Sequence, residues 1–403
     1  MRGFGWSGAP PGERSELGTQ CSELYTLLGM GGTLLITNDF PPRPGGIQQF
    51  VYNLAVRQPG DVVVYASTWK GAGKFDAEQP FEVVREDTGM LLPTPRVARR
   101  AAEIARARGC DRVWFGAAAP LGLLGEGLRR RAGVERVVAL THGHEVGWAA
   151  LRGARGLLRR IARGADVVTY LGEYTRVRLA RAIGGLTALE RLAPGVDVEA
   201  YAPGVDGSEV RRRYGLDGRP VVVCVSRLVP RKGQDVLIRA LPKVRAAVAD
   251  AALLIVSGGP YRRDLERLAR EHGVERDVVF TGSVSWAELP AHYAAGDVFA
   301  MPCRTRRRGL DVEGLGIVYL EASATGLPVV AGDSGGAPDA VLEGQTGFVV
   351  PGRDVDRVAG RLIELLRDRE LAMRMGAAGR AWVESEWRWE TQAARLHALF
   401  AQE

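Results

Sequence analysis

Three short segments of the chain combine glycines with charged or polar side chains in patterns that suit a phosphorylated ligand. The first, residues 38–48 (NDFPPRPGGIQ), lies between an apolar run and an amphipathic stretch. Gly45 and Gly46 would leave backbone N–H groups uncovered at a helix start, where the amides and the helix dipole attract a phosphate. An ordinary Pro/Gly loop is the alternative. The chain contains neither G-x-G-x-x-G nor a P-loop motif, which disfavours a dinucleotide fold.

The second segment, residues 226–233 (SRLVPRKG), places three basic residues directly after an expected strand. The chain has 54 Lys and Arg residues, of which only four are lysines, so the choice of Lys232 is informative. The planar fork of Arg227 and the compact charge of Lys232 together suit a pyrophosphate. A solvated basic turn is the alternative.

The third segment, residues 313–321 (EGLGIVYLE), carries Gly314 and Gly316 at an expected helix start, where they would expose amides as an anion cradle. With Glu313 at the mouth of the helix, Glu321 lies two turns in, roughly 12 Å along the axis. Carboxylates so spaced could hold two ends of an elongated ligand, and they are too far apart for a glycosidase pair. A capped helix with two solvated glutamates is the alternative.

Two further segments carry weaker signals. His142 and His144 lie in residues 141–145 (THGHE) at the end of an expected strand. This position favours two interpretations equally: histidines that line a ligand cleft, or buried histidines with satisfied hydrogen bonds. Arginines recur at helical spacing through residues 152–163, beside leucines and an isoleucine. That pattern suits contact with anionic lipid, although a solvated helix face explains it more simply. The arginines are Arg152, Arg155, Arg159 and Arg163.

Composition excludes several classes of protein. The net charge is +7, but the bases are nearly all arginine, which indicates a coding bias rather than a nucleic-acid partner. Residues 1–200 carry +6 of this excess and residues 201–403 carry +1. The cysteines form no C-x-x-C pair and the five histidines no metal spacing, so we expect neither a disulfide framework nor a metal site. Cys110 and Cys224 should be buried and reduced.

Residues 1–29 are rich in Gly, Pro and Ser and lack the apolar core of a signal peptide. We expect them to be disordered, or to precede a native start at Met30. Nowhere does the chain contain 18 consecutive apolar residues, so no membrane span is expected. These features together predict a cytoplasmic protein.

Short apolar runs alternate with amphipathic stretches, and the series restarts after residue 200. Such runs are typical of parallel strands buried on both faces, and two series predict two doubly wound α/β domains joined near residues 201–220. After residue 354 we expect helices only, with a kink or boundary at Trp387 or Trp389, because residues two apart cannot share one helix face. The strands are predicted at 33–37, 62–66, 112–115, 137–141, 167–169, 221–226, 252–257, 278–281, 298–301, 328–331 and 347–350.

Taken in order, the Gly-Gly loop, the Ser-Arg-x4-Lys-Gly motif and the Glu-x7-Glu motif resemble the retaining family-4 glycosyltransferases of GT-B type, over residues 33 to about 400. The segments NDFPPRPGGIQ, VSRLVPRKGQD, GLDVEGLGIVYLEA, AGDSGGAPDAV and EWRWE look most like actinobacterial phosphatidylinositol mannosyltransferases. The resemblance implies two Rossmann-like domains facing a central cleft. It places an extension at 1–32, an acceptor domain at 33–202, a donor domain at 203–385 and a returning helix at 386–403.

The resemblance also implies a role for each matching residue. His142 would orient the transferred sugar, Arg227 and Lys232 would bind the diphosphate, and Glu313 would hydrogen-bond the sugar; these four are the expected catalytic residues. Glu321 would take the ribose hydroxyls, and the turn at residues 282–284 would read the base. The expected donor-binding residues are Gly45, Gly46, Ser226, Gly258, Gly282, Val284, Leu315, Gly316, Ile317, Val318 and Glu321. The expected acceptor-binding residues are Asp39, Gln48 and His144.

The implied reaction is a metal-independent, retaining transfer of mannose from GDP-mannose to a phosphatidylinositol mannoside in α-1,6 linkage. Implied partners are the nucleotide sugar, a glycolipid acceptor and an anionic membrane surface at the inner face of the cell membrane, without nucleic acid. Alternatives are another nucleotide sugar, a soluble or natural-product acceptor, a nucleotide-sugar epimerase, or a non-catalytic binder of nucleotide or lipid. The arginines of residues 304–309 and Pro260 depart from the family pattern.

Overall fold

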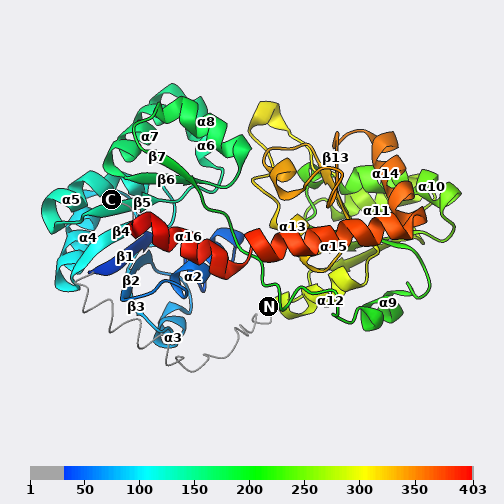
Figure 1. Ribbon diagram of the computed structural model, residues 1–403, viewed down its shortest axis with the longest axis horizontal. Helices are drawn as coiled ribbons and strands as arrows, with labels where there is room; N and C mark the ends of the chain where they lie inside the picture. The colour runs from blue at the N-terminus through cyan, green and yellow to red at the C-terminus, as the bar shows by residue number, and fades with distance from the viewer. Residues whose placement is uncertain (1–30, 402–403) are drawn as a thin grey trace.

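The computed structural model describes residues 31–401, which form two α/β domains lying side by side (Figure 1). Each domain is built on one parallel sheet, so the predicted fold class is confirmed. The strand orders are β3-β2-β1-β4-β5-β6-β7 and β10-β9-β8-β11-β12-β13. The order reverses beside β1 and beside β8, and ligands of open α/β sheets bind at the carboxyl ends of strands at such switch points.

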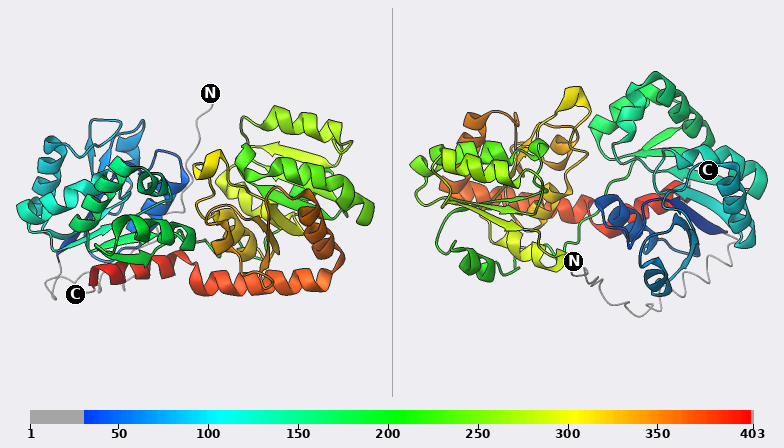
Figure 2. Two further views of the ribbon diagram at one scale, coloured as in Figure 1. Left: turned by 90° about the horizontal axis from the view of Figure 1, so that it is seen from above. Right: turned by 180° about the vertical axis from the view of Figure 1, so that it is seen from behind.

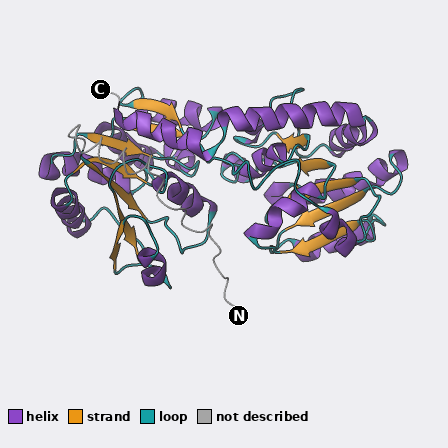
Figure 3. Ribbon diagram, turned by 60° about the horizontal axis from the view of Figure 1, so that its bottom comes forward, coloured by secondary structure: helices purple, strands orange, loops and turns teal. Residues whose placement is uncertain are grey.

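The first domain packs helices against both faces of its seven-stranded sheet (Figure 3). Its strands are β1 (Gly32–Thr37), β2 (Val62–Ser67), β3 (Glu82–Glu86), β4 (Cys110–Phe115), β5 (Arg136–Ala139), β6 (Val167–Tyr170) and β7 (Ala188–Arg191). Its helices are α2 (Gly46–Ala55), α3 (Ala72–Ala77), α4 (Pro95–Ala107), α5 (Gly125–Ala132), α6 (Glu145–Ala150), α7 (Arg152–Gly164) and α8 (Glu173–Ile183).

The second domain repeats this layering around six strands. They are β8 (Val221–Val225), β9 (Ala252–Val256), β10 (Val278–Gly282), β11 (Val298–Met301), β12 (Val329–Gly332) and β13 (Gly347–Val350). The helices of this domain are α9 (Ser208–Tyr214), α10 (Gln234–Ala247), α11 (Arg262–Glu271), α12 (Leu289–Ala294), α13 (Ile317–Ala324), α14 (Val355–Arg367) and α15 (Arg369–Glu386). The last helix, α16 (Trp389–Ala401), packs on the first domain.

Every predicted strand is present within two residues of its expected bounds. Apart from the half-buried edge strand β10, these strands are largely apolar and buried between helix layers. The sequence analysis missed β3 and β7, which form the two edges of the first sheet. Their sequences, EVVRE and ALER, mix charged with apolar residues because one side of an edge strand meets water. Helix α9 also went unpredicted within the expected join at 201–220.

The chain crosses between the domains twice, and the two crossings lie side by side. Helix α15 runs along the second domain and α16 along the first (Figure 2). The predicted boundary falls at Trp387, between these helices, where its carbonyl accepts a 2.7 Å hydrogen bond from Val196 N–H on the other crossing. A Cβ on Gly195 would lie 2.6 Å from the Trp389 Cα, so this close approach requires glycine. Helix α16 is fixed to the first domain by Arg136 Nε, which donates to Leu399 O at 2.8 Å.

Within residues 31–401, no helix is both long and apolar enough to cross a lipid bilayer. Predictions about residues 1–29 and Cys21 concern residues outside the described range. Cys110, Cys224 and Cys303 are buried and unpaired, as expected for the first two. Burial raises the pKa of each of these thiols to about 11, so they are poor nucleophiles at neutral pH.

Candidate active site

The loop between β1 and α2 brings together the residues expected on the acceptor side. Gln48 Nε2 donates to Asp39 Oδ1 at 2.7 Å, which folds the glutamine side chain back over the start of the helix. Gly45 is the N-cap of α2, and a Cβ there would lie 2.1 Å from Gln48 Oε1. Apart from its chain neighbours and the helix backbone, no heavy atom lies within 4 Å of a Cβ built on Gly46, so the space beside this residue is open.

His142 lies in the loop from β5 to α6, which also belongs to the first domain. Its Nε2 hydrogen-bonds to the carbonyl oxygen of Gly116, and because a carbonyl only accepts, Nε2 carries the proton. Burial lowers the pKa of His142 below its ordinary 6.5, so the ring is neutral at pH 7 and Nδ1 is an acceptor. Phe50 packs edge-on against the ring, with the centroids 5.6 Å apart.

The sequence analysis did not assign a role to Glu145, although it lies in the same THGHE segment. Its side chain is fully buried, and Oε2 accepts from the backbone N–H of His142 at 3.0 Å. Oε1 lies 3.1 Å from Nε2 of His144, whose ring is half-exposed. Glu145 therefore fixes the loop that presents both histidines.

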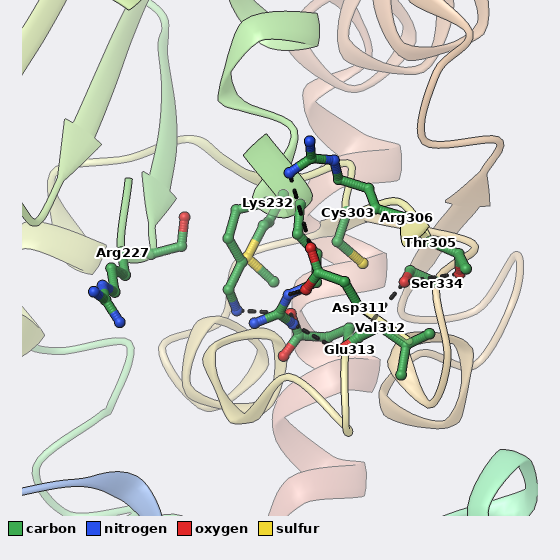
Figure 4. A network of polar contacts seen from close by, with 12 residues as sticks. Arg227, Lys232, Cys303, Thr305, Arg306, Asp311, Val312, Glu313 and Ser334 are labelled. Carbon is green, nitrogen blue, oxygen red and sulfur yellow. Dashed lines mark hydrogen bonds and ion pairs between the residues drawn. The ribbon is translucent and has the colours of Figure 1, made fainter. Parts of the chain in front are cut away.

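The loop from β8 to α10 supplies the expected diphosphate ligands from the second domain. Lys232 Nζ lies 2.7 Å from Glu313 Oε2, whereas the Arg227 side chain is exposed and makes no contact of this kind with any described residue (Figure 4). Ser226 is buried, and its hydroxyl accepts from Gln234 Nε2 at 2.8 Å. The buried Ser226 thus helps to fix the shape of this loop.

Glu313 lies in a tight loop that precedes α13. Its N–H donates to Ser334 Oγ at 3.2 Å, and its carbonyl accepts from Gly336 N–H at 2.9 Å. A Cβ on Gly335 would lie 2.1 Å from the Glu313 carbonyl oxygen, which explains the paired glycines of AGDSGGAPDAV. Gly316, with φ 84°, caps α13. The 12 Å helical estimate for the glutamate pair is therefore wrong, because residues 313–316 are not helical.

The first turn of α13 has the form expected of an anion cradle. No side chain caps it, which leaves the amides that follow Gly316 available to a ligand. Ile317 and Val318 are half-buried at this end, and Leu315 is buried beneath it. The helix start, Glu313 and Lys232 thus lie within one loop cluster of the second domain.

Glu321, one turn into α13, is 8% exposed, which rules out the interpretation as a solvated glutamate. Burial raises its pKa to about 7, and the hydrogen bond donated by Tyr293 Oη to Oε2 at 2.6 Å opposes that shift. Of the two carboxylate oxygens, Oε2 is therefore the one that Tyr293 holds.

Backbone hydrogen bonds join the loops after β8, β9 and β10 beside Arg227. Leu228 N–H donates to Gly258 O, and Ser257 N–H donates to Gly282 O, both at 3.0 Å. Gly282 has φ 76°, a conformation that favours glycine, and Val284 is half-buried just beyond it. The residues expected to read the base therefore form one continuous turn at the edge of the phosphate loop.

The two halves of the site touch each other. A Cβ on Gly314 would lie 3.6 Å from the His142 carbonyl oxygen, and one on Gly143 would lie 3.7 Å from the Gly314 Cα. The histidine loop of the first domain thus packs on the glutamate loop of the second. Among the described residues no three His, Cys, Asp or Glu side chains are grouped to hold a metal ion.

Family models match both domains. Residues 44–200 match Glycosyltransferase Family 4, and residues 207–382 match Glycosyl transferases group 1. The chain belongs to these glycosyltransferases. Among solved structures similar to this glycosyltransferase are HepE of Anabaena in complex with UDP (TM-score 0.76, 22% identity, 92% of this chain and 100% of that one) and a Rickettsia africae glycosyltransferase (TM-score 0.77, 16% identity, 92% and 98%). At these identities, the likeness concerns the fold.

Curated relatives of this glycosyltransferase are similar over nearly the whole chain. The GDP-mannose-dependent α-(1-6)-phosphatidylinositol monomannoside mannosyltransferase of Mycolicibacterium smegmatis is 56% identical over 374 residues, 91% of this chain and 98% of the relative. The GDP-mannose-dependent monoacylated α-(1-6)-phosphatidylinositol monomannoside mannosyltransferase of Corynebacterium glutamicum is 50% identical over 377 residues, 92% of this chain and 98% of the relative.

Proposed function

We propose that this glycosyltransferase moves mannose from GDP-mannose to a phosphatidylinositol mannoside in α-1,6 linkage, with retention of configuration. The observation that carries the proposal is the 56% identity to a mannosyltransferase of that description over 91% of the chain. The site supports it, because the loop that carries His142 in the first domain packs on the loop that carries Glu313 in the second, and Glu313 in turn contacts Lys232.

In the proposed reaction, Arg227 and Lys232 bind the donor diphosphate and stabilise the charge that develops as the sugar–phosphate bond breaks. The open first turn of α13 adds backbone amides to this anion site. Fixed cations in a site that excludes water are an effective substitute for a metal ion, so we expect no metal requirement. The acceptor hydroxyl forms the new bond on the face that the diphosphate leaves, and a diphosphate oxygen takes its proton.

Glu313, Glu321 and His142 orient the two parts of the donor. Glu313 accepts a hydrogen bond from a sugar hydroxyl, and Glu321 accepts from the ribose. His142 offers Nδ1 as an acceptor to the sugar from the opposite domain, since Nε2–H is already donated to Gly116. Asp39 and Gln48, which are joined to each other beside the start of α2, face the acceptor.

A peripheral contact with an anionic membrane forms the second part of the proposal. Helix α7 of the acceptor domain buries Leu158 and Ile161 and turns Arg152, Arg159 and Arg163 toward water. Leu151 and Leu157 beside these arginines are 66% and 41% exposed. Exposed leucines flanked by arginines suit insertion among anionic head groups, where a lipid acceptor resides.

The direct test incubates the purified protein with GDP-mannose and monomannosylated phosphatidylinositol, measures GDP release and determines the anomeric configuration of the product. We expect release that depends on the acceptor, persists in EDTA and yields an α-linked product. Absence of GDP release with this pair contradicts the proposal. Turnover with UDP-glucose in its place indicates another donor, and sugar isomerisation without acceptor indicates an epimerase.

A further inference from the structure

Arg231, the neighbour of Lys232, makes three contacts with three consecutive residues of the glutamate loop. Its Nε lies 3.0 Å from Asp311 Oδ1, and Nη1 donates to the Val312 carbonyl at 2.9 Å and to Glu313 Oε2 at 2.7 Å. A guanidinium has a rigid set of donors, so three directed contacts fix its orientation. Arg231 therefore ties the loop before α13 to the loop after β8.

Glu313 receives both neighbouring cations on the same oxygen. Lys232 Nζ and Arg231 Nη1 each lie 2.7 Å from Oε2, whereas Oε1 accepts no hydrogen bond within residues 31–401. Figure 4 shows Lys232 beside Glu313. A carboxylate can accept at both oxygens. The arrangement turns one oxygen inward onto the cations and leaves the other to accept from a hydroxyl.

The two cations differ in their freedom to move. Arg231 is held on one side by Asp311 and on the other by Glu313, whereas the Lys232 ammonium has three donors and a single ion pair, with Glu313. A diphosphate that attracts both cations therefore draws Lys232 more readily than Arg231. Glu313 keeps its orientation in that exchange because Arg231 stays on Oε2.

The arginine-rich segment at residues 304–309, which departs from the family pattern, also supports Arg231 and the glutamate loop. Arg304 N–H donates to the Arg231 carbonyl at 2.9 Å, and the Arg304 side chain lies 2.9 Å from the buried Asp235. Arg306 N–H donates to the Asp311 carbonyl at 2.9 Å. These contacts hold the backbone of Arg231 and Asp311, so the segment acts as a fixed support beneath the glutamate loop.

We infer that Arg231 is a positioning residue that holds Glu313 through Oε2 so that Oε1 meets the donor sugar while Lys232 serves the diphosphate. Asp311 holds Arg231 in turn. The inference rests on the proposed function for the identity of the donor. Its consequence is specific: loss of Arg231 weakens recognition of the sugar and leaves recognition of the nucleotide largely intact.

The test compares the dissociation constants of GDP-mannose and GDP, measured by calorimetry, for the wild type and Arg231→Gln. We expect GDP-mannose binding to weaken about tenfold, as for a lost charge-assisted hydrogen bond, and GDP binding to change by less than about threefold. Arg231→Lys keeps the charge but lacks the planar fork of the guanidinium, so its GDP-mannose affinity should lie between those of the wild type and Arg231→Gln. Arg374→Gln, an exposed arginine paired with Glu370 on α15, is the matched control.

A double-mutant cycle tests whether Arg231 acts through Glu313. In the Glu313→Gln background, Arg231→Gln should cause no further loss of GDP-mannose affinity, whereas independent residues would give additive losses. Equal losses for GDP and GDP-mannose would mean that Arg231 binds the diphosphate itself, and unchanged affinities would mean that it positions nothing; either result overturns the inference. A wild type that fails to bind GDP-mannose refutes the donor, and UDP-glucose with UDP then serves for the same comparison.

Discussion

Asp339 in the second domain occupies the space that a side chain on Gly172 of the first domain would need. A Cβ on Gly172 would lie 2.3 Å from Asp339 Oδ2. Gly172 is the N-cap of α8, and no side chain of that segment caps the helix. Burial raises the pKa of the Asp339 carboxyl, and the amides of Tyr174 and Glu173, which donate hydrogen bonds to it, oppose that shift. One domain therefore caps a helix of the other.

Removal of this cap should loosen the contact between the domains. Asp339→Ala leaves two amides of α8 without an acceptor, a loss of about 1 kcal/mol for a typical N-cap. We expect a larger radius of gyration in small-angle scattering and a several-fold lower kcat, with GDP affinity retained because the proposed nucleotide site lies within the second domain. Gly172→Ala, which displaces the carboxylate, should act in the same direction.

The exposed Asp356 on α14 provides the control for that experiment, since Asp356→Ala removes a carboxylate from the same domain without touching the first. Asp339 and Gly172 variants that match the wild type in both scattering and kcat would show that the trans-domain cap has no part in closure.

The buried Glu321 should lower the stability of the fold at high pH while contributing to nucleotide binding. Its pKa rises from 4.5 to about 7 on folding because burial disfavours the charged form. Between these values the folded state binds more protons than the unfolded state, so stability falls as pH rises, and the penalty is complete above pH 7. Glu321→Gln removes a penalty of at most about 3 kcal/mol at pH 8 and much less near pH 5.

Denaturant unfolding at pH 5 and pH 8 measures this difference, and GDP calorimetry should show weaker nucleotide binding by the same variant. Glu364→Gln, at a half-exposed position of α14, is the control variant. A change in the free energy of unfolding that is equal at pH 5 and pH 8 for Glu321→Gln would contradict the role assigned to burial.

Most of the fold could be predicted from the sequence because both sheets are parallel and largely buried. Nearly every strand of such a sheet is a continuous apolar run that can be recognised in the sequence. Edge strands such as β3 escaped because their exposed side admits charge. Residues near ligands stood out where glycine and charge are combined locally, as at Lys232. The roles of Arg231 and Asp339 could not be predicted in this way. The partner of Arg231, Glu313, lies 82 positions away in the sequence, and the partner of Asp339 lies in the other domain.

Arg227 should separate function from stability. Its side chain is exposed and makes no hydrogen bond or ion pair with the described residues, so Arg227→Ala removes no contact that stabilises the fold. We expect an unchanged melting temperature and a rate reduced about 100-fold or more, the usual effect of losing one preorganised group that stabilises developing charge. A lower melting temperature, or turnover within twofold of the wild type, would remove Arg227 from the diphosphate site.

His142 should act as a neutral hydrogen-bond acceptor. Because burial lowers its pKa below 6.5, the rate should not depend on its titration between pH 6.5 and 8, and should fall at lower pH as Nδ1 becomes protonated. His142→Ala should lower kcat by about 100-fold. Calorimetry should show unchanged GDP affinity, and His272→Ala, at an exposed position, is the control. A low-pH loss of rate that survives in His142→Ala would assign that titration to another group.

The exposed face of α7 predicts how the enzyme reaches a lipid acceptor. Reversal of three charges by Arg152→Glu, Arg159→Glu and Arg163→Glu should abolish sedimentation with vesicles that contain phosphatidylinositol, because each basic residue near an anionic surface contributes about 1 kcal/mol. Leu151→Ser with Leu157→Ser should weaken binding in a way that salt does not restore, since the leucines contribute apolar burial. GDP affinity should be unchanged in both variants.

Reversal of charge at Arg369 and Arg374, exposed on α15, is the matched control. Equal vesicle binding by the α7 and α15 variants would show that general positive charge, and not this helix face, brings the protein to the membrane.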